Sequence, residues 1–159
     1  MLNYDLVTAK AAYRILKPAD VPAFLALAAE FHGSDPAARE RMLSTVAHLA
    51  RHKGSGSIFV IEREEDAVGY VILVGCWSVA LGGMLLCLEE LYVSPAHRGL
   101  GIATDFIGLL AKVAPAGTVA IRCDGDFSRR ARGWARRLGF REEAGRILIR
   151  EIGKDEAGR

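Results

Sequence analysis

Two adjacent carboxylates, Glu89 and Glu90, stand shortly before a loop that contains two glycines, Gly99 and Gly101. A glycine loop that leads into a helix turns backbone N–H groups outward, and the positive end of the helix dipole favours an anion there. A carboxylate beside such a loop can take a proton or hold a cation. The pattern therefore predicts a phosphate-bearing cofactor held close to a cationic or proton-losing substrate.

Two common nucleotide-binding loops do not fit this segment. A P-loop continues from its glycines into Gly-Lys-Ser/Thr, whereas Gly101 is followed by Ile102. A dinucleotide loop has a third glycine where Thr104 stands, and no acidic residue closes a following strand at the expected distance. Neither a P-loop nucleotide nor a dinucleotide is expected.

A third loop pattern does fit, because Arg98 is followed by Gly101 and Ala103 in the order Arg-x-x-Gly-x-Ala. This spacing resembles the Q/R-x-x-G-x-G/A loop with which GNAT-family N-acetyltransferases bind the pyrophosphate of acetyl-coenzyme A (acetyl-CoA). The resemblance implies that acetyl-CoA is the co-substrate, and that the loop contacts it through Arg98, Gly99, Leu100, Gly101, Ile102, Ala103 and Thr104. The alternative is a strand–helix turn whose glycines only close the backbone.

The run before the loop extends the resemblance. Residues 69–93 are similar to the G-[FY]-…-S-x-W-x-G-…-L-E-D-L-Y-V run of the diamine (polyamine) N-acetyltransferases, and residues 29–32 are similar to their A-E-Y-E segment. The likeness implies that Glu89 takes a proton from a substrate amine, usually through a water, before direct attack in a ternary complex. It assigns recognition of an ammonium to Glu90, with Glu30 as a further substrate-binding candidate.

The family fold adds a place for the co-substrate. Two central parallel strands splay apart, here 84–93 and 118–123, and the pantetheine arm enters the gap and pairs with the open strand edge. A β-bulge in the first of these strands is common in the family, and strict alternation would send Glu89 and Glu90 to opposite faces. The candidates that this likeness implies for contact with the co-substrate, besides the loop, are Leu91, Tyr92, Val93 and Ser128.

Amine acetylation has a separate chemical task for each of the two carboxylates. An ammonium has no lone pair, so a base must produce the neutral amine before it can attack a thioester. A second carboxylate can hold a distant ammonium by a charge-assisted contact. The alternative for Glu89 and Glu90 is a solvated strand end, and for Glu30 and His32 it is a helix end whose dipole the histidine complements.

Two positions depart from the family patterns. Counting back from Gly139 and Phe140, the tyrosine that protonates the departing CoA thiolate is replaced by Ala135. Losing this acid slows the reaction by about a hundredfold rather than forbidding it, and Tyr92, Cys123 or a water could replace it. Ala80 stands where the diamine enzymes carry a tryptophan, so an amino-acid-like amine is an alternative to a polyamine.

Composition sets the broad class. The chain has 159 residues, 51% of them apolar, which suits a single domain over residues 1–159. Its net charge of +2 excludes neither an acidic nor a basic partner. No apolar run is long enough to span a membrane and the start lacks signal-peptide features, so a cytoplasmic protein is expected. The three cysteines are too far apart for a zinc site and read as reduced core thiols, so no metal is expected.

Hydrophobic periodicity predicts a mixed α/β fold, with a central six- to seven-stranded sheet and about four helices. In order along the chain, we expect a strand at 13–16, helices from Asp20 to Phe31 and from Asp35 to Lys53, strands at 57–61, 68–74 and 84–93, a helix at 104–113, a strand at 118–123, a helix at 127–138, and a last hairpin of 140–142 with 147–152. This is the order of elements in the GNAT fold.

The resulting hypothesis is an N-acetyltransferase that acetylates a primary amine of a small molecule, without a nucleic-acid or membrane partner. A protein N-acetyltransferase and an acetyl-CoA sensor with little catalysis are the alternatives, the latter because of Ala135. Nucleic-acid binding by the arginine-rich segment 127–138 ranks below both, since such a charge run is usually a solvated face. The apolar strands over 68–93 and the family resemblance are compatible with a homodimer.

Overall fold

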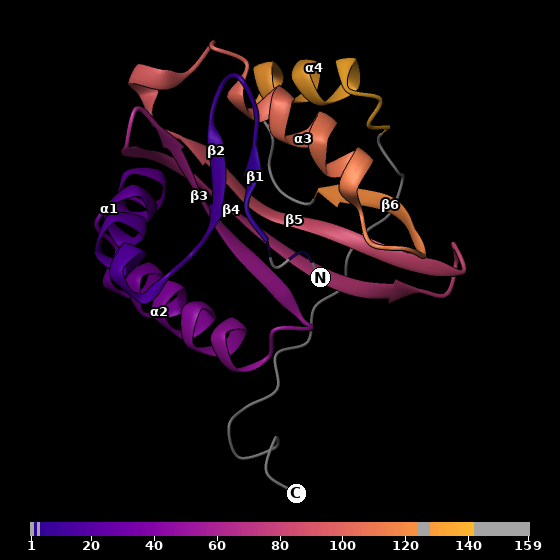
Figure 1. Cartoon of the computed structure of the whole chain (residues 1–159), viewed down its shortest axis with the longest axis horizontal. Helices are drawn as coiled ribbons and strands as arrows, with labels where there is room; N and C mark the ends of the chain where they lie inside the picture. Colours follow the sequence, from indigo (N-terminus) through magenta and orange to yellow (C-terminus); the bar gives the residue numbers. More distant parts are fainter. Residues whose placement is uncertain (1, 3, 124–127, 142–159) are drawn as a thin grey trace, which may run out of the picture. The chain divides into compact units, whose positions relative to one another are not determined.

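The computed structural model of the protein describes residues 2, 4–123 and 128–141 (Figure 1). The chain divides into two compact units, residues 1–126 and residues 127–159. The first unit contains the β-sheet and the helices α1 to α3, and the described part of the second contains helix α4. The single domain expected from the sequence stays a prediction.

A mixed β-sheet forms the centre of the first unit. Its six described strands lie in the order β1-β2-β3-β4-β5-β6, with β1 to β5 antiparallel to their neighbours and β5 parallel to β6. The strands are β1 Leu6–Val7, β2 Ala12–Ile15, β3 Gly56–Arg63, β4 Asp66–Ser78, β5 Gly83–Val93 and β6 Thr118–Cys123. The predicted fold class is confirmed. Sequence analysis missed β1, which is too short to show a periodicity.

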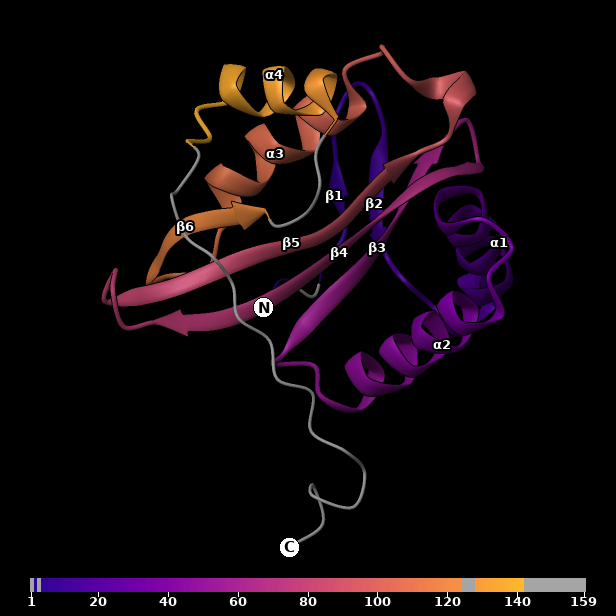
Figure 2. The ribbon, with the colours of Figure 1, turned by 180° about the vertical axis from the view of Figure 1, so that it is seen from behind.

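Helices cover both faces of this sheet. Figure 1 shows α1 and α2 on one face and α3 on the opposite face, and the view from behind in Figure 2 agrees. The α-helices are α1 Val21–His32, α2 Pro36–Arg51, α3 Ile102–Val113 and α4 Arg129–Arg137, with short 3₁₀ turns η1 Pro18–Asp20 and η2 Pro95–His97. A helix therefore connects the parallel strands β5 and β6, as such a pair requires.

Each face of the sheet has its own aromatic core. On the face of α1 and α2, a buried cluster contains Phe24, Leu27, Ala28, Met42, Leu49, Ile58, Tyr70, Ile72 and Tyr92. On the face of α3, the ring of Phe106 lies 5.0 Å from that of Tyr13 and 5.8 Å from that of Phe59. The Tyr13 hydroxyl also donates to the Ile102 carbonyl at 2.9 Å, which ties the start of α3 to the sheet.

The two predicted helix caps differ in outcome. The Asp35 carboxylate accepts hydrogen bonds from the N–H groups of Ala37 at 3.0 Å and Ala38 at 3.2 Å, so the predicted cap of α2 is confirmed. Asp20 occupies the residue before α1, but its side chain makes no cap hydrogen bond. The Asp20 carboxylate instead bonds to the segment before the helix: it pairs with the Arg14 guanidinium at 2.9 Å and accepts from the Lys17 N–H at 2.7 Å.

The β4–β5 hairpin is longer than its sequence pattern suggested, since β4 continues to Ser78. Its end is exposed, with Trp77 at 64% and Val79 at 90% of their full accessible area. The cysteine prediction is therefore only partly right: Cys87 is buried, whereas Cys76 is exposed.

The end of the described chain differs from the predicted last hairpin. Phe140 and Arg141 belong to no strand, and the Phe140 N–H donates to the Ala135 carbonyl at 3.1 Å, which makes it part of the end of α4. The remaining predicted strand positions, 142 and 147–152, lie outside the described residues.

Candidate functional site

A β-bulge interrupts the pairing of β5 with β4 at the two carboxylates. Leu88 lies opposite Leu73 and Glu90 lies opposite Ile72, so Glu89 is an extra residue in β5. Simple alternation would place Glu90 on the same face as Leu88, and the bulge moves it to the other face. The register therefore puts Glu90 on the face of α1 and α2.

One edge of β5 becomes open at the same point. The parallel pairing with β6 runs from Met84 opposite Thr118 to Leu88 opposite Cys123. Within the part of the chain that is described, residues 89–93 pair with β4 alone. Among the described residues, no strand pairs with the other edge of this segment, and an unpaired strand edge is a place where an extended ligand can add. The described part of β6 ends opposite Leu88, before Leu91 and Val93, and the splay of the two strands stays a prediction.

The loop between β5 and α3 has the backbone that its glycines predicted. Gly99 and Gly101 have φ angles of +82° and +81°, a left-handed region that favours glycine. The Asp105 N–H bonds to the Gly101 carbonyl at 2.9 Å, which closes the first turn of α3. By helix geometry, the N–H groups before it have no acceptor within the helix. The start of α3 therefore offers N–H groups and a positive dipole to an anion.

Two cationic side chains lie at this loop, one from the loop itself and one from the β1–β2 turn. The Arg98 Nε donates to the Val93 carbonyl at 2.8 Å, and its guanidinium carbon lies 5.4 Å from the centre of the Tyr92 ring. The Lys10 Nζ lies 2.6 Å from the position that a Cβ on Gly101 would occupy. Sequence analysis missed Lys10, because it comes from the β1–β2 turn. A cation at a helix N-terminus opposes the dipole, so this arrangement favours an anion between them.

Glu90 is held by two polar side chains. Its carboxylate oxygens lie 3.0 and 3.1 Å from the His32 Nε2, and the Tyr70 hydroxyl donates to Oε2 at 2.7 Å. The Glu90 side chain is 16% exposed. Burial, followed by the hydrogen bond to Glu90 and its charge, raises the pKa of Tyr70, so this phenol stays a donor at neutral pH. Helix α1 thus supplies His32 to a site centred on β5.

A second phenol–carboxylate pair lies on the same face. The buried Tyr92 donates its hydroxyl proton to Glu30 Oε2 at 2.8 Å. Burial and then the hydrogen bond to Glu30 raise the pKa of Tyr92, while the charge of Arg98 acts in the opposite direction. The rings of Tyr70 and Tyr92 lie 5.8 Å apart, so the two pairs are neighbours. A structural role at the helix end was the alternative for Glu30 and His32. In the structure, Glu30 contacts Tyr92 and His32 contacts Glu90, both of them predicted site residues.

The other predicted residues occupy separate places. Glu89 is exposed in the bulge, next to Glu90 but outside its hydrogen-bonded group. Cys123 ends β6. Ser128 belongs to the second unit, where its hydroxyl accepts from the Ala131 N–H at 3.2 Å and caps α4, and its predicted contact with a co-substrate stays a prediction. Ala135 lies within α4, so that helix position carries no acid.

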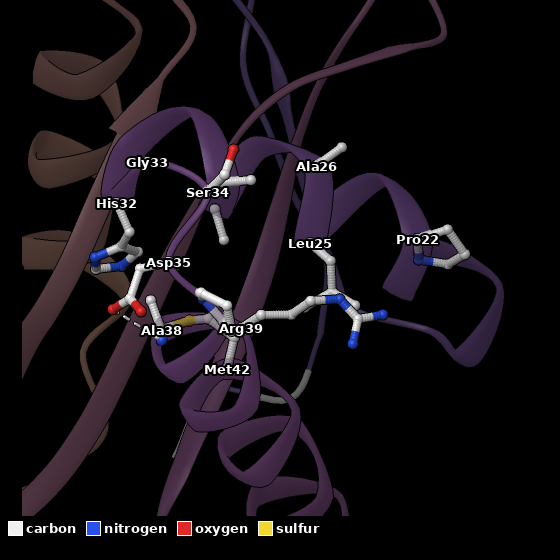
Figure 3. Close-up of a pocket in the computed structure, with 13 residues that line it drawn as sticks. Pro22, Leu25, Ala26, His32, Gly33, Ser34, Asp35, Ala38, Arg39 and Met42 are labelled. Carbon is white, nitrogen blue, oxygen red and sulfur yellow. Dashed lines mark hydrogen bonds between the residues drawn. The ribbon is translucent and has the colours of Figure 1, made fainter.

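A cavity of about 510 Å³ opens between α1 and α2 (Figure 3). His32 lines it, and the same imidazole contacts Glu90. The described residues contain no group of three or more side chains suited to a metal ion. None of the helices described is long and apolar enough to cross a membrane.

Comparison with known families gives one match that covers most of the chain. The sequence model described as the acetyltransferase (GNAT) family matches residues 21–140. This range contains the carboxylates, the open edge of β5 and the glycine loop. No relative is found among curated proteins.

Several solved structures share the fold at low sequence identity. A possible acetyltransferase from Clostridium difficile 630 is 16% identical with a TM-score of 0.73, over 88% of this chain and 96% of that one. Ribosomal-protein-alanine N-acetyltransferase from Brucella melitensis is 20% identical with a TM-score of 0.67, over 89% and 99%. Glucosamine-6-phosphate N-acetyltransferase from Arabidopsis thaliana is 15% identical with a TM-score of 0.69, over 87% and 96%. At these identities the similarity concerns the fold alone.

Proposed function

Because the chain belongs to the acetyltransferase (GNAT) family, we propose that it transfers the acetyl group of acetyl-CoA to a primary amine of a small molecule. The amine nitrogen attacks the thioester carbonyl carbon, a C–N bond forms, and the C–S bond breaks. The amine loses a proton, and CoA leaves as the thiolate, which is then protonated. Direct attack requires both substrates to be bound at once.

One observation carries this proposal: within residues 89–104, the bulge, the open strand edge and the anion-binding loop follow one another directly. A carboxylate, an edge for an extended arm and a phosphate cradle are the parts that such a reaction needs. Their order along one strand and loop matches the order of thioester, pantetheine and pyrophosphate in acetyl-CoA.

The loop fits a pyrophosphate by its own features. A Cβ at Gly99 would meet no atom within 4 Å, so the backbone there is open to a ligand. In the proposed complex, Arg98, Lys10 and the N–H groups at the start of α3 bind phosphate oxygens, and the open edge at Leu91 and Val93 bonds to pantetheine. Acetyl-CoA brings the activated acetyl group, and the chain positions it.

We assign different roles to the two neighbouring carboxylates. Both oxygens of Glu90 already lie within hydrogen-bond distance of His32 or Tyr70, which suits a fixed negative group that attracts an ammonium. Glu89 is exposed and outside this network, so water can carry a proton to it. We therefore assign proton removal to Glu89 and amine recognition to Glu90. Glu30 has an indirect role, since its carboxylate accepts the hydrogen bond of the Tyr92 hydroxyl on the same face of the sheet.

The test is release of free CoA thiol from acetyl-CoA with a panel of acceptors. The panel contains polyamines, chosen for the resemblance of residues 69–93, together with amino acids, amino sugars and peptides. Release with one amine class, lost in Glu89→Gln and kept in Glu40→Gln on the exposed surface of α2, supports the proposal. Transfer that is unchanged in Glu89→Gln would overturn the assignment of the base.

A second candidate function is an acetyl-CoA-binding sensor. It rests on Ala135, which cannot protonate a leaving thiolate at the helix position where the family pattern has a tyrosine. Firm binding of acetyl-CoA without thiol release for every acceptor would favour the sensor. An equal response of ligand binding in Glu89→Gln and the unsubstituted protein would agree with it.

A further inference from the structure

The cavity between α1 and α2 has a largely apolar wall. Pro22, Leu25 and Ala29 line it from α1, and Ala38 and Met42 line it from α2. Its volume of about 510 Å³ lies in the range of small-molecule pockets, which runs from about 300 to 1,000 Å³. A ligand with a compact apolar body would fit this wall.

One lining residue of this cavity, His32, also belongs to the candidate site. His32 lines the cavity, and its Nε2 lies 3.0 Å from Glu90 Oε1. A single imidazole therefore separates the apolar space from the carboxylate assigned to amine recognition. In Figure 3, His32 stands at one side of the cavity and Pro22 at the other. A ligand body seated here has its His32 end directed towards Glu90.

The charged groups of the cavity point to the other end of the ligand. Asp35 lines the cavity, but its carboxylate caps the N–H groups of Ala37 and Ala38. The Arg39 side chain reaches past Leu25 in Figure 3, and it has no ion-pair partner among the described residues. Arg39 is therefore a cation available to an anionic group, and a guanidinium matches the shape of a carboxylate.

We propose that this cavity binds the body of the acceptor, and that the acceptor is an amino carboxylate: a primary amine at the His32 end, an apolar chain or ring, and a carboxylate on Arg39. This assignment rests on the proposed acetyl transfer. It selects against diamines, because a second ammonium would meet the like charge of Arg39. The acceptor class thus follows from the cavity rather than from the glycine loop.

The test compares three acceptors of one length: 6-aminohexanoate, hexylamine and 1,6-diaminohexane. The expected result is the highest kcat/KM for the aminohexanoate. Arg39→Met, which keeps an apolar stem, raises KM for that acceptor by about tenfold or more and leaves the KM for hexylamine unchanged. Arg51→Met on the last turn of α2, outside the cavity, is the matched control and leaves all three unchanged.

A binding measurement separates this proposal from the proposed function. Titration calorimetry with 6-aminohexanoate, without acetyl-CoA, is expected to show binding that Arg39→Met and the cavity-filling Ala29→Leu weaken. If no amine is acetylated but this binding and its losses are seen, acetyl transfer fails and the cavity assignment stands. If transfer occurs with equal kcat/KM for all three acceptors, and Arg39→Met changes none of them, the cavity assignment is overturned.

Discussion

The two halves of β5 differ in their strand pairing and in their side chains, although they form one continuous strand. Residues 83–88 pair with β4 on one side, and Met84 to Leu88 pair with β6 on the other, with Leu85 to Leu88 all buried. In the part of the chain that is described, residues 89–93 pair with β4 alone, and they contain both glutamates. The change occurs within one residue, since pairing with β6 ends at Leu88 and the bulge is at Glu89.

This difference shows how a sheet can present polar groups without losing its core. The first half anchors the strand by burial and by hydrogen bonds on both edges, which holds the second half in place. The second half has no second partner strand among the described residues, and it holds the Glu90 carboxylate partly buried. These features cost stability in an ordinary strand and are useful in a binding site. Substitutions in the two halves are therefore expected to separate stability from activity.

The largest expected effect is on the anchoring half. Leu86→Ala removes a side chain that is 2% exposed and leaves a cavity, so the free energy of unfolding should fall by about 2–5 kcal/mol. Chemical denaturation followed by circular dichroism measures this. A loss below about 1 kcal/mol would show that the first half does not anchor the strand.

In residues 89–93, Glu89→Gln is expected to lower activity and to leave stability nearly unchanged. It removes the proposed base, so kcat should fall by about a hundredfold. The side chain is exposed, so the free energy of unfolding should change by no more than about 0.5 kcal/mol. Steady-state kinetics and denaturation of the same preparation give both values. A large loss of stability would mean that Glu89 supports the bulge rather than the chemistry.

The glycine loop offers a sharper version of the comparison. Gly101→Ala places a Cβ at a φ of +81° and against Lys10, so we expect a loss of about 1–2 kcal/mol in stability and weaker binding of acetyl-CoA. Binding is measured by calorimetry. Gly108→Ala is the control within α3: a Cβ there meets nothing within 4 Å, and the change should stabilise the helix by about 1 kcal/mol with binding unchanged. Equal binding by both variants would contradict the proposed phosphate cradle.

The smallest effect concerns Tyr70, the donor to Glu90. Its pKa is raised by burial and by Glu90, so the folded protein keeps a phenolic proton that the unfolded chain loses above pH about 10. The contribution of Tyr70 to the free energy of unfolding should therefore be fully present below that pH and should decrease as the pH rises further. Tyr70→Phe is expected to flatten this fall by up to about 1.4 kcal/mol per pH unit. Urea unfolding between pH 9 and 11 measures the slope, and identical slopes would contradict the pKa shift.

Part of the candidate site could be predicted because its signals are local. The glycine spacing predicted a loop with left-handed residues, and Gly99 and Gly101 adopt that conformation. Asp35 followed by a proline predicted the start of α2, where the chain forms that cap. Such features depend on a few neighbouring residues, so a sequence displays them directly.

Other parts depend on contacts between distant segments. Tyr70, His32 and Glu90 come from three elements, and no spacing within the sequence relates them. Lys10 reaches Gly101 from a turn near the start of the chain. Asp20 had the right position for a cap of α1, but its carboxylate pairs with Arg14 and accepts from the Lys17 N–H instead.

By itself, the sequence determined the order of helices and strands from β2 to α4, the glycine loop with its left-handed residues and the presence of two adjacent carboxylates, because local backbone preference and hydrophobic periodicity depend on consecutive residues. Only the tertiary structure decided which face each carboxylate occupies, since one extra residue in a strand register reverses the alternation. It also decided that α1 and α2 form an open cavity lined in part by His32, the residue that contacts Glu90, because the packing of two helices depends on side chains far apart in the chain.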